Sequence, residues 1–265
     1  MPEKVIGNNA KGISFFRRAR IASEAFLDIE NWREVLPRAA VGETVTEIRL
    51  RNGTRVVAPP QNKLWPIFSD IWYHSAYTKH CAIARNGLVV DVGANVGVFS
   101  LFASRMARLV YSLEPASSNF SRLVSNTSRT RNIVPLNLAC AAQNGRMTLD
   151  LSSDAVSFSL KTTSSHGKQE TVEVVSLPTL FESYNIERCD FLKLDCEGSE
   201  FDIILESDPS LFQRVKCIVM EYHDHLSKEF SHEDILQRLT TLGFRSKTYS
   251  PNGTNGMIAA VRRNS

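Results

Sequence analysis

The sequence lacks a surplus of charge of either sign and any long apolar run. Lys and Arg number 31 against 28 Asp and Glu, so the net charge is only +3, which is too small to indicate nucleic acid as a partner. No apolar segment reaches the ~18 residues of a membrane span, and residues 1–14 contain no apolar core of a secretory signal. We therefore expect a cytoplasmic protein that does not insert stably into a membrane.

Cysteine is scarce as well, and its five positions are odd in number and far apart. The sequence contains no Cys-x-x-Cys pair and no Cys/His spacing of a zinc site. We expect free thiols that pack as small buried hydrophobic groups in a reducing compartment. They are Cys81, Cys140, Cys189, Cys196 and Cys217.

The composition that remains is that of a globular protein. Apolar residues make up 43% and charged residues 22% of the chain, both close to the averages of globular domains. A length of 265 residues suits one large domain with an appendage or two small domains. The sequence leaves the formation of a homo-oligomer open.

The N-terminal region is expected to begin with an amphipathic helix. Between Ser14 and Leu36 apolar residues recur three, four or seven positions apart, which is helical periodicity. Ser14 can cap this helix, and Pro37 is expected to end it. The first turn is rich in arginine, so docking on a membrane surface is an alternative to packing against the main domain.

A hairpin and a second helix are expected to follow. The Asn52-Gly53 pair lies between two short β segments and predicts a tight turn with positive φ at both residues. An aromatic-rich helix is expected at about 64–77. We assign residues 1–87 to an N-terminal helix, hairpin and cap region, and residues 88–265 to the main domain.

The main domain alternates short apolar strands with helices, which predicts an α/β fold with a mostly parallel sheet. Strands are expected at 88–93, 110–113, 133–138, 146–151, 156–160, 170–175, 190–195, 215–221 and 257–262. Helices are expected at 97–107, 117–128, 178–184 and 231–242, and an exposed loop at 161–169.

The first chemical motif is the glycine turn after the first of these strands. Gly93 ends the strand, where the absence of a side chain lets a ligand approach the backbone, and Gly97 begins a helix with free N–H groups. Asn95 and Val98 replace the second and third glycines of the dinucleotide fingerprint, which disfavours a pyrophosphate ligand. The pattern suits the methionine carboxylate of S-adenosylmethionine instead.

The second motif is Glu114, which ends the next strand. An acidic side chain at this point of a nucleotide-binding sheet accepts hydrogen bonds from the ribose hydroxyls. Since Glu114 follows the glycine turn at the appropriate distance, we expect it to bind ribose.

The third motif places Asp195, Glu197 and Glu200 around a glycine at the end of a later strand. Such carboxylates can hold Mg²⁺, but nothing in the spacing requires an ion, and we assign no metal ligand. Asp195, Glu197 and His223 are candidates for the general base. For Lys193, two residues before Asp195, a structural ion pair is favoured over a catalytic role, because an unpaired buried ammonium is very costly. Asp91 and Glu221 are its candidate partners.

Taken in order, these motifs resemble the FkbM-type S-adenosylmethionine-dependent methyltransferases. The resemblance extends over about 70–244, and Lys-x-Asp-x-Glu-Gly-x-Glu is its most specific part. Cys196 stands where members usually carry an aliphatic residue. The segments that carry the resemblance are 91–97, 114–115, 175–180, 193–200, 221–223 and 242–244.

The resemblance implies a Rossmann-like class I methyltransferase sheet and methyl transfer to a hydroxyl oxygen of a sugar or natural product. It implies that S-adenosylmethionine is the cofactor and that the partner is a small-molecule or glycan acceptor. The implied cofactor-binding residues are Asp91, Gly93, Asn95 and Gly97 near the methionine part, Glu114 at the ribose, Leu138 and Ala139 near the adenine, and Asp195. Asp195 and Glu197 would lie beside the reacting methyl group.

The sequence is compatible with other functions. Within methyltransferases, the alternatives are transfer to nitrogen and transfer to a lipid-linked glycan. A Rossmann dehydrogenase is disfavoured by the missing glycines. A nucleoside-binding module without turnover is the non-enzymatic alternative.

Overall fold

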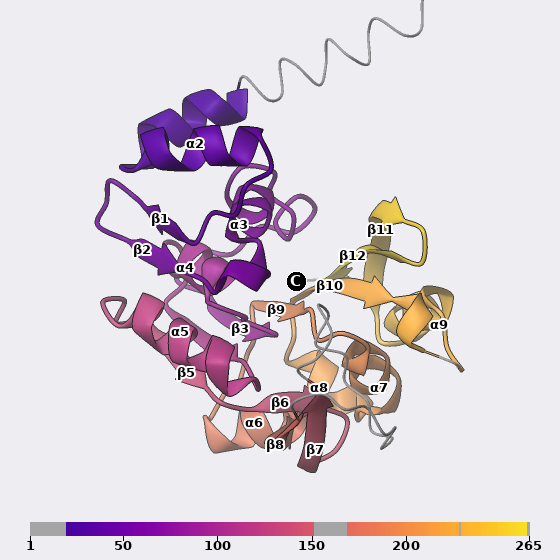
Figure 1. The fold of residues 1–265 in the computed structure, drawn as a ribbon. Helices are drawn as coiled ribbons and strands as arrows, with labels where there is room; N and C mark the ends of the chain where they lie inside the picture. The colour runs from indigo at the N-terminus through magenta and orange to yellow at the C-terminus, as the bar shows by residue number, and fades with distance from the viewer. Residues whose placement is uncertain (1–19, 151–168, 228, 264–265) are drawn as a thin grey trace, which may run out of the picture. The chain divides into compact units, whose positions relative to one another are not determined.

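The structure, a computed structural model, describes residues 20–150, 169–227 and 229–263 (Figure 1). Two compact units divide the chain, one within residues 1–75 and one within residues 76–265, and each is described by itself. The start of the predicted N-terminal helix, the predicted strand at 156–160 and most of the predicted loop at 161–169 lie outside the described residues. The predicted domain boundary at 87 remains a prediction.

In the first unit, the predicted single helix is two helices. Residues 20–28 are helical, and Ile29 then pairs with Leu50 in a β-bridge before α2 (Trp32–Ala40) begins. Pro37 lies inside α2, so the predicted end at Pro37 is wrong. The φ that proline imposes is itself helical, and α2 ends only before Gly42, whose φ is +77°.

The predicted hairpin is present as β1 (Glu47–Arg49) and β2 (Arg55–Val57), which pair antiparallel. Its turn differs from the prediction, because only Gly53 has a positive φ, +86°. The Gly53 N–H donates to the Leu50 carbonyl oxygen at 3.0 Å, as in a three-residue loop that ends in a left-handed glycine. After η1 (Pro60–Asn62), the aromatic-rich helix is α3 (Leu64–Trp72), which ends before the predicted residue 77.

In the second unit, a seven-stranded sheet has the order β11-β12-β10-β9-β3-β4-β5 (Figure 1). The five strands from β10 to β5 are parallel, and β12 runs antiparallel to both β10 and β11. The predicted α/β fold with a mostly parallel, Rossmann-like sheet is therefore confirmed. The strands are β3 (Leu88–Val92), β4 (Leu109–Leu113), β5 (Ile133–Leu136), β9 (Phe191–Leu194), β10 (Cys217–His223), β11 (Phe244–Asn252) and β12 (Asn255–Arg262).

A three-stranded sheet of order β6-β8-β7 and several helices complete this unit. The small sheet consists of β6 (Ala139–Ala141), β7 (Gly145–Asp150) and β8 (Gln169–Ser176). The helices are α4 (Val98–Ser104), α5 (Ser117–Thr127), α6 (Leu177–Ser183), α7 (Ser199–Glu206), α8 (Pro209–Gln213), η2 (Asp224–Leu226) and α9 (His232–Thr241). Of these elements, β6, α7, α8 and η2 were not predicted from the sequence, and neither was β11 of the large sheet.

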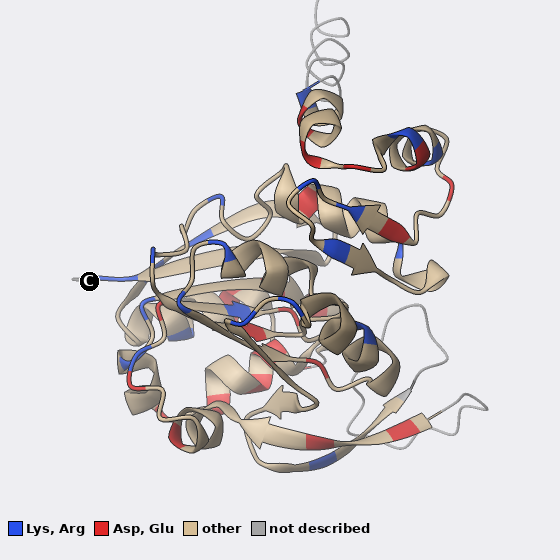
Figure 2. Ribbon diagram, turned by 90° about the vertical axis from the view of Figure 1, so that its left-hand side faces the viewer, with Lys and Arg blue, Asp and Glu red and all other residues tan. Residues whose placement is uncertain are grey.

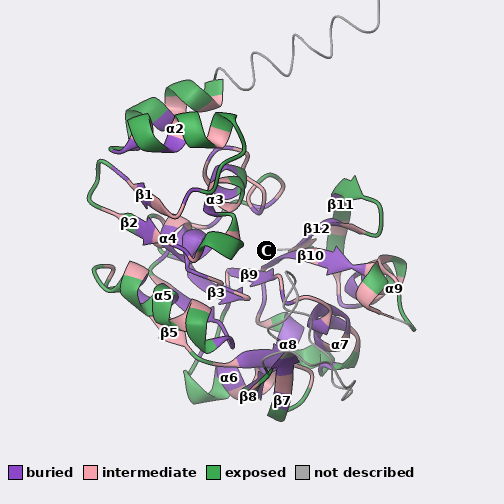
Figure 3. Cartoon of the chain, in the orientation of Figure 1, coloured by how far each residue is buried: buried purple, intermediate pink, exposed green. Residues whose placement is uncertain are grey.

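The buried strands in the middle of the large sheet form the core of the second unit. Figure 3 shows β3, β9 and β10 in the purple of buried residues, while α5 and α9 carry exposed positions. Acidic and basic segments are interspersed along this unit in Figure 2, in keeping with a small net charge. None of the described helices is long and apolar enough to cross a membrane.

The strand order also locates a topological switch point. From β3 the chain continues to β4 and β5 on one side of the sheet, and it later adds β9 and β10 on the other side. In open parallel sheets, ligands bind beyond the carboxyl ends of the strands at such a point. The candidate site therefore lies where β3 and β9 end.

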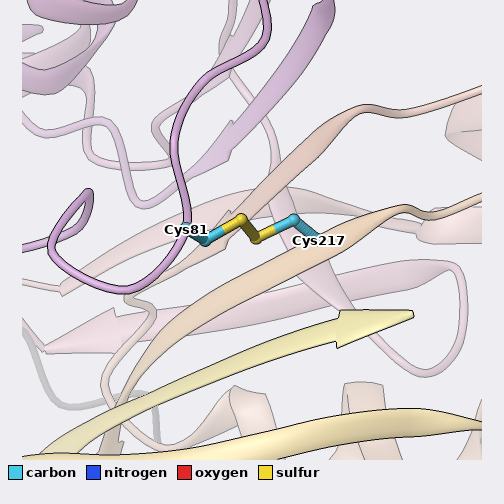
Figure 4. The surroundings of a disulfide bond; sticks show 2 residues. All are labelled: Cys81 and Cys217. Atoms are coloured by element: carbon cyan, nitrogen blue, oxygen red, sulfur yellow. A yellow bond between two sulfur atoms is a disulfide. The ribbon is translucent and has the colours of Figure 1, made fainter. Parts of the chain in front are cut away.

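The prediction that all five cysteines are free is wrong for two of them. Cys81 and Cys217 form a disulfide, with their Cα atoms 6.7 Å apart (Figure 4). Cys217 is the first residue of β10, whereas Cys81 precedes β3, 136 residues earlier in the chain. The sheet topology brings them together, and their spacing in the sequence cannot show it. Cys140, Cys189 and Cys196 are free and buried, as predicted.

Candidate active site

The glycine turn connects the end of β3 to α4. Gly93, Asn95 and Gly97 all have positive φ, at +74°, +51° and +89°. A Cβ atom on Gly93 would lie 1.7 Å from the backbone oxygen of Asp195, and one on Gly97 would lie 2.8 Å from the Leu123 side chain. The space beside Gly93 is therefore occupied by the backbone of the segment that follows β9. It is not left free for a ligand, contrary to the prediction.

Glu114 lies where β4 ends and is held by two backbone groups. Its carboxylate oxygens accept the N–H of Asn95 at 2.9 Å and the N–H of Ala116 at 3.0 Å. Burial raises the pKa of Glu114 to about 7, although these two hydrogen bonds act to lower it. The Asn119 side chain donates a third hydrogen bond to this carboxylate, which leaves only part of its accepting capacity for a ribose hydroxyl.

Asn137 stabilises this region, a role that no sequence motif predicted. Its side-chain amide donates to the backbone oxygens of Glu114 and Pro115, at 2.9 and 2.8 Å, and so connects the ends of β4 and β5. Leu138 follows Asn137 and is half-buried, whereas Ala139 is buried in a small core with Met147. Both predicted adenine neighbours thus follow β5, but the side chain of Ala139 faces the core.

Lys193 has the buried carboxylate partner that was predicted. Its Nζ lies 3.0 Å from Oδ1 of Asp91, and the Ser100 hydroxyl donates to the other oxygen of Asp91 at 2.6 Å. Lys193 also donates to the backbone oxygens of Val92 and Gly93. Burial acts to lower the pKa of Lys193, but the Asp91 and Asp195 carboxylates outweigh it and raise the pKa. Asp91 is thus occupied by Lys193 and Ser100, and its predicted cofactor-binding role stays a prediction.

Asp195 follows β9 and accepts a hydrogen bond from Tyr77, which no sequence motif predicted. The hydroxyl of Tyr77 donates to Oδ2 of Asp195 at 2.7 Å, and Nζ of Lys193 lies 3.7 Å from the same oxygen. The ring of Tyr77 packs edge-on against Phe99 of α4, with the ring centroids 5.3 Å apart. Tyr77 is 118 residues from Asp195 in the chain, so no local motif connects them.

His223, at the end of β10, is surrounded by carboxylates. Its Nδ1 lies 2.7 Å from Oε1 of Glu200, and its Nε2 lies 3.6 Å from Glu197 and 3.8 Å from Glu221. Burial acts to lower the pKa of His223, but the hydrogen bond to Glu200 and the charges of Glu200 and Glu197 outweigh it and raise the pKa to about 9.

Two of these carboxylates are themselves perturbed. Burial and the negative charge of Asp195 raise the pKa of Glu221 to about 7. Burial also raises the pKa of Glu197. Glu221 was predicted only as a partner of Lys193. It lies two residues before His223 on β10, but its proximity to Glu197 depends on the alignment of β9 and β10.

Among the described residues, one group could share a metal ion. Ligand atoms of Asp195, Glu197 and His223 lie within 4.8 Å of one another. Metal binding would require a free lone pair on Nε2 of His223, yet the ring has carboxylates near both nitrogens, which favours protonation of both. The absence of a metal therefore stays a prediction, with chelation as its test.

Comparison with known proteins identifies the family. The model of the methyltransferase FkbM domain matches residues 91–246. Hexuronic acid methyltransferase AglP of Haloferax volcanii is 28% identical over 134 residues, which cover 50% of this chain and 54% of that protein. The 31-O-demethyl-FK506 methyltransferase FkbM of Streptomyces tacrolimicus is 24% identical over 218 residues, which cover 69% of this chain and 84% of that protein. The chain thus spans about half the length of AglP.

A solved S-adenosylmethionine-dependent methyltransferase from Aquifex aeolicus aligns with 12% identity and a TM-score of 0.42, over 76% of this chain and 95% of that one. The family match carries the assignment, because it extends over more than half of the chain and includes the glycine turn, Glu114 and the third motif. The prediction of an S-adenosylmethionine-dependent methyltransferase domain is confirmed, and the chain belongs to the FkbM methyltransferase family.

Proposed function

We propose that this protein transfers the methyl group of S-adenosylmethionine to a hydroxyl oxygen of a sugar or natural product. One observation carries the proposal: Asp195, Glu197, Glu221 and His223 gather beside the glycine turn, at the ends of β9 and β10. A hydroxyl is a weak nucleophile at neutral pH, and a nearby carboxylate can take its proton as the methyl group is transferred.

The cofactor is expected to lie across the ends of β3 and β4. Glu114 would accept hydrogen bonds from the ribose hydroxyls, and the turn with Gly93, Asn95 and Gly97 would face the methionine part. Leu138, half-buried after β5, would lie near the adenine. Asp91 would act indirectly, through the charge of Lys193. When bound, the cofactor supplies an electrophilic methyl group on a sulfonium.

The proton acceptor is expected to be a carboxylate. Asp195 accepts a hydrogen bond from Tyr77 and lies 3.7 Å from the Lys193 ammonium. Both contacts stabilise its negative charge and make it a weaker base. Within the described residues, the side chains of Glu197 and Glu221 accept no hydrogen bond. Nε2 of His223 lies 3.6 Å from Glu197 and 3.8 Å from Glu221, which is beyond hydrogen-bond distance. A pKa of about 7 at Glu221 is also close to the value that suits a general base at neutral pH.

The relatives support a hydroxyl or sugar acceptor. AglP is named for methylation of a hexuronic acid, and the Streptomyces protein for methylation of 31-O-demethyl-FK506. Because the chain spans only about half of AglP, its own acceptor is part of the proposal. Transfer to nitrogen and transfer to a lipid-linked glycan are the alternatives.

The test is a screen of hexuronic acids, glycans, lipid-linked glycans and hydroxylated natural products with methyl-labelled S-adenosylmethionine. Mass spectrometry of the products locates the label. Label on a hydroxyl oxygen supports the proposal, whereas label on nitrogen or on a carboxylate overturns the assignment of the acceptor group. Cofactor binding without labelled product in any acceptor class would favour a binding module.

With an acceptor in hand, the neutral isosteres Asp195→Asn, Glu197→Gln and Glu221→Gln test the site. If a carboxylate takes the proton, at least one of the two glutamine variants should lose 10²-fold or more in kcat, of the order expected for a general base, with cofactor affinity within about twofold. Full turnover in both glutamine variants would remove the carboxylates from the proton transfer.

A further inference from the structure

Glu200 is fully buried, as is Asp91, whereas the side chains of Glu197 and Glu221 are 34% and 35% exposed. Glu200 lies in the first turn of α7 with no exposed surface. Its Oε2 accepts the backbone N–H of Gly198 at 2.8 Å and lies 3.5 Å from the Cys196 thiol. Its Oε1 lies 2.7 Å from Nδ1 of His223. Contacts on both oxygens hold the Glu200 side chain in one orientation.

This arrangement fixes the ring of His223. The residue is only 3% exposed, and because a carboxylate accepts hydrogen bonds, we assign Nδ1 as the donor in this pair. The ring cannot rotate without losing the bond to Glu200, so Nε2 points permanently at the space between Glu197 and Glu221.

The charges that face His223 come from every element packed around it. Glu200 lies on α7, Glu197 on the loop before α7 and Asp195 at the end of β9. Glu221 lies on β10 itself, and the ring of His225 on η2 has its centroid 6.1 Å from that of His223. Four carboxylates and one imidazole thus surround the ring, and their sum favours a cation.

We propose that Glu200 is a positioning residue that keeps His223 as a fixed imidazolium, whose positive charge at Nε2 lies within ion-pair distance of the carboxylates of Glu197 and Glu221 beside the acceptor hydroxyl. In this arrangement His223 does not take the proton. The hydroxyl proton moves to a carboxylate of Glu197 or Glu221 while the hydroxyl oxygen bonds to the methyl carbon, and the electron pair of the broken carbon–sulfur bond stays on sulfur. The cation stabilises the carboxylates before this step. The catalytic part of the inference rests on the proposed function.

The first arm of the test needs no acceptor. In protein labelled with ¹⁵N-histidine, the ring nitrogens of His223 are assigned by their loss in His223→Gln and followed from pH 5 to 10. We expect both nitrogens to remain protonated at pH 7.5 in the native protein. In Glu200→Gln the ring should titrate at least one pH unit lower. A neutral ring at pH 7.5 in the native protein would overturn the inference, whether or not any variant folds and whatever the acceptor is.

The second arm uses the acceptor found in the screen. Glu200→Gln should lower kcat at least tenfold with the Kd of the cofactor within twofold, and should move the fall of kcat at high pH to lower pH by the same shift as the ring titration. The matched control is Glu206→Gln, an exposed glutamate of the same helix, which should leave both readouts unchanged.

Two outcomes of this arm contradict the proposal. If kcat rises as His223 loses its proton, the ring itself is the base. If EDTA abolishes activity and Mg²⁺ restores it, Nε2 is a metal ligand instead of a donor. A screen that yields no acceptor would count against the proposed function alone, because the ring titration is independent of turnover.

Discussion

Lys193 and Asp91 form a buried ion pair across neighbouring strands, with Nζ 3.0 Å from Oδ1 and side chains only 3% and 0% exposed. They are register partners on β9 and β3, next to the switch point of the sheet. Lys193 also binds the backbone oxygens of Val92 and Gly93. The pair therefore joins the glycine turn to the strand that carries the third motif.

Removal of the lysine charge should destabilise the protein strongly. Lys193→Met leaves Asp91 buried beside only the Ser100 hydroxyl, and the loss of one partner of a buried pair costs about 3–5 kcal/mol. We expect the free energy of unfolding in urea to fall by this amount. Lys247→Met, which removes an exposed lysine of β11, is the control and should change it by less than about 0.5 kcal/mol. Equal effects of the two substitutions would show that the ion pair between Lys193 and Asp91 does not stabilise the fold.

The ion pair illustrates what the sequence could predict. Alternation along a buried strand places Lys193 on the same face as Asp195 and requires a partner carboxylate. Both Asp91 and Glu221 are compatible with that requirement. Only the register between β3 and β9 decides in favour of Asp91, and register depends on the complete sheet.

Most of the features that the sequence did not predict also depend on contacts between distant parts of the chain. β11 has a mostly polar sequence with few buried positions, and it is a strand because it pairs with β12 at the edge of the sheet. Pro37 continues α2 because its φ is already helical. Tyr77 and the disulfide are contacts between segments more than one hundred residues apart. The glycine turn, by contrast, is a local motif and was predicted at the correct residues.

Glu114 predicts a pH dependence of nucleoside binding. Burial raises its pKa to about 7, and the carboxylate is the form that accepts hydrogen bonds from ribose hydroxyls. Below pH 7 the protonated form dominates in the free protein, so affinity should fall as the pH decreases. Between pH 8 and pH 6 the Kd should rise about tenfold, in proportion to the loss of the competent carboxylate form.

The ligand for this measurement is 5′-methylthioadenosine, which has the ribose hydroxyls but no amino-acid part that titrates between pH 6 and 8. Calorimetry gives its Kd at each pH. Glu114→Gln should weaken binding by about 1.5–3 kcal/mol and flatten the pH profile. Glu182→Gln, an exposed glutamate of α6, should retain the native profile. A flat profile in the native protein would remove Glu114 from the ribose site.

Tyr77 should stabilise the fold through its hydrogen bond to Asp195. Tyr77→Phe removes a donor to a charged carboxylate, and hydrogen bonds to charged groups contribute about 1.5–3 kcal/mol. Tyr249→Phe is the matched control, because its hydroxyl donates at the same 2.7 Å distance to a neutral backbone oxygen, that of Ala76. Urea denaturation should show a larger loss for Tyr77→Phe than for Tyr249→Phe. The reverse order would mean that the hydrogen bond between Tyr77 and Asp195 does not stabilise the fold.

The disulfide between Cys81 and Cys217 should make stability depend on the redox state. It closes a loop across 136 residues, and the chain-entropy relation gives an upper limit of about 5 kcal/mol for a loop of that length. In protein purified without reductant and then unfolded, thiol titration should detect three free thiols, and five after reduction. Dithiothreitol should lower the Tm of the native protein but not that of the double variant Cys81→Ser/Cys217→Ser. Five free thiols before reduction, or equal responses of the two proteins to dithiothreitol, would show that the two cysteines are not joined in solution.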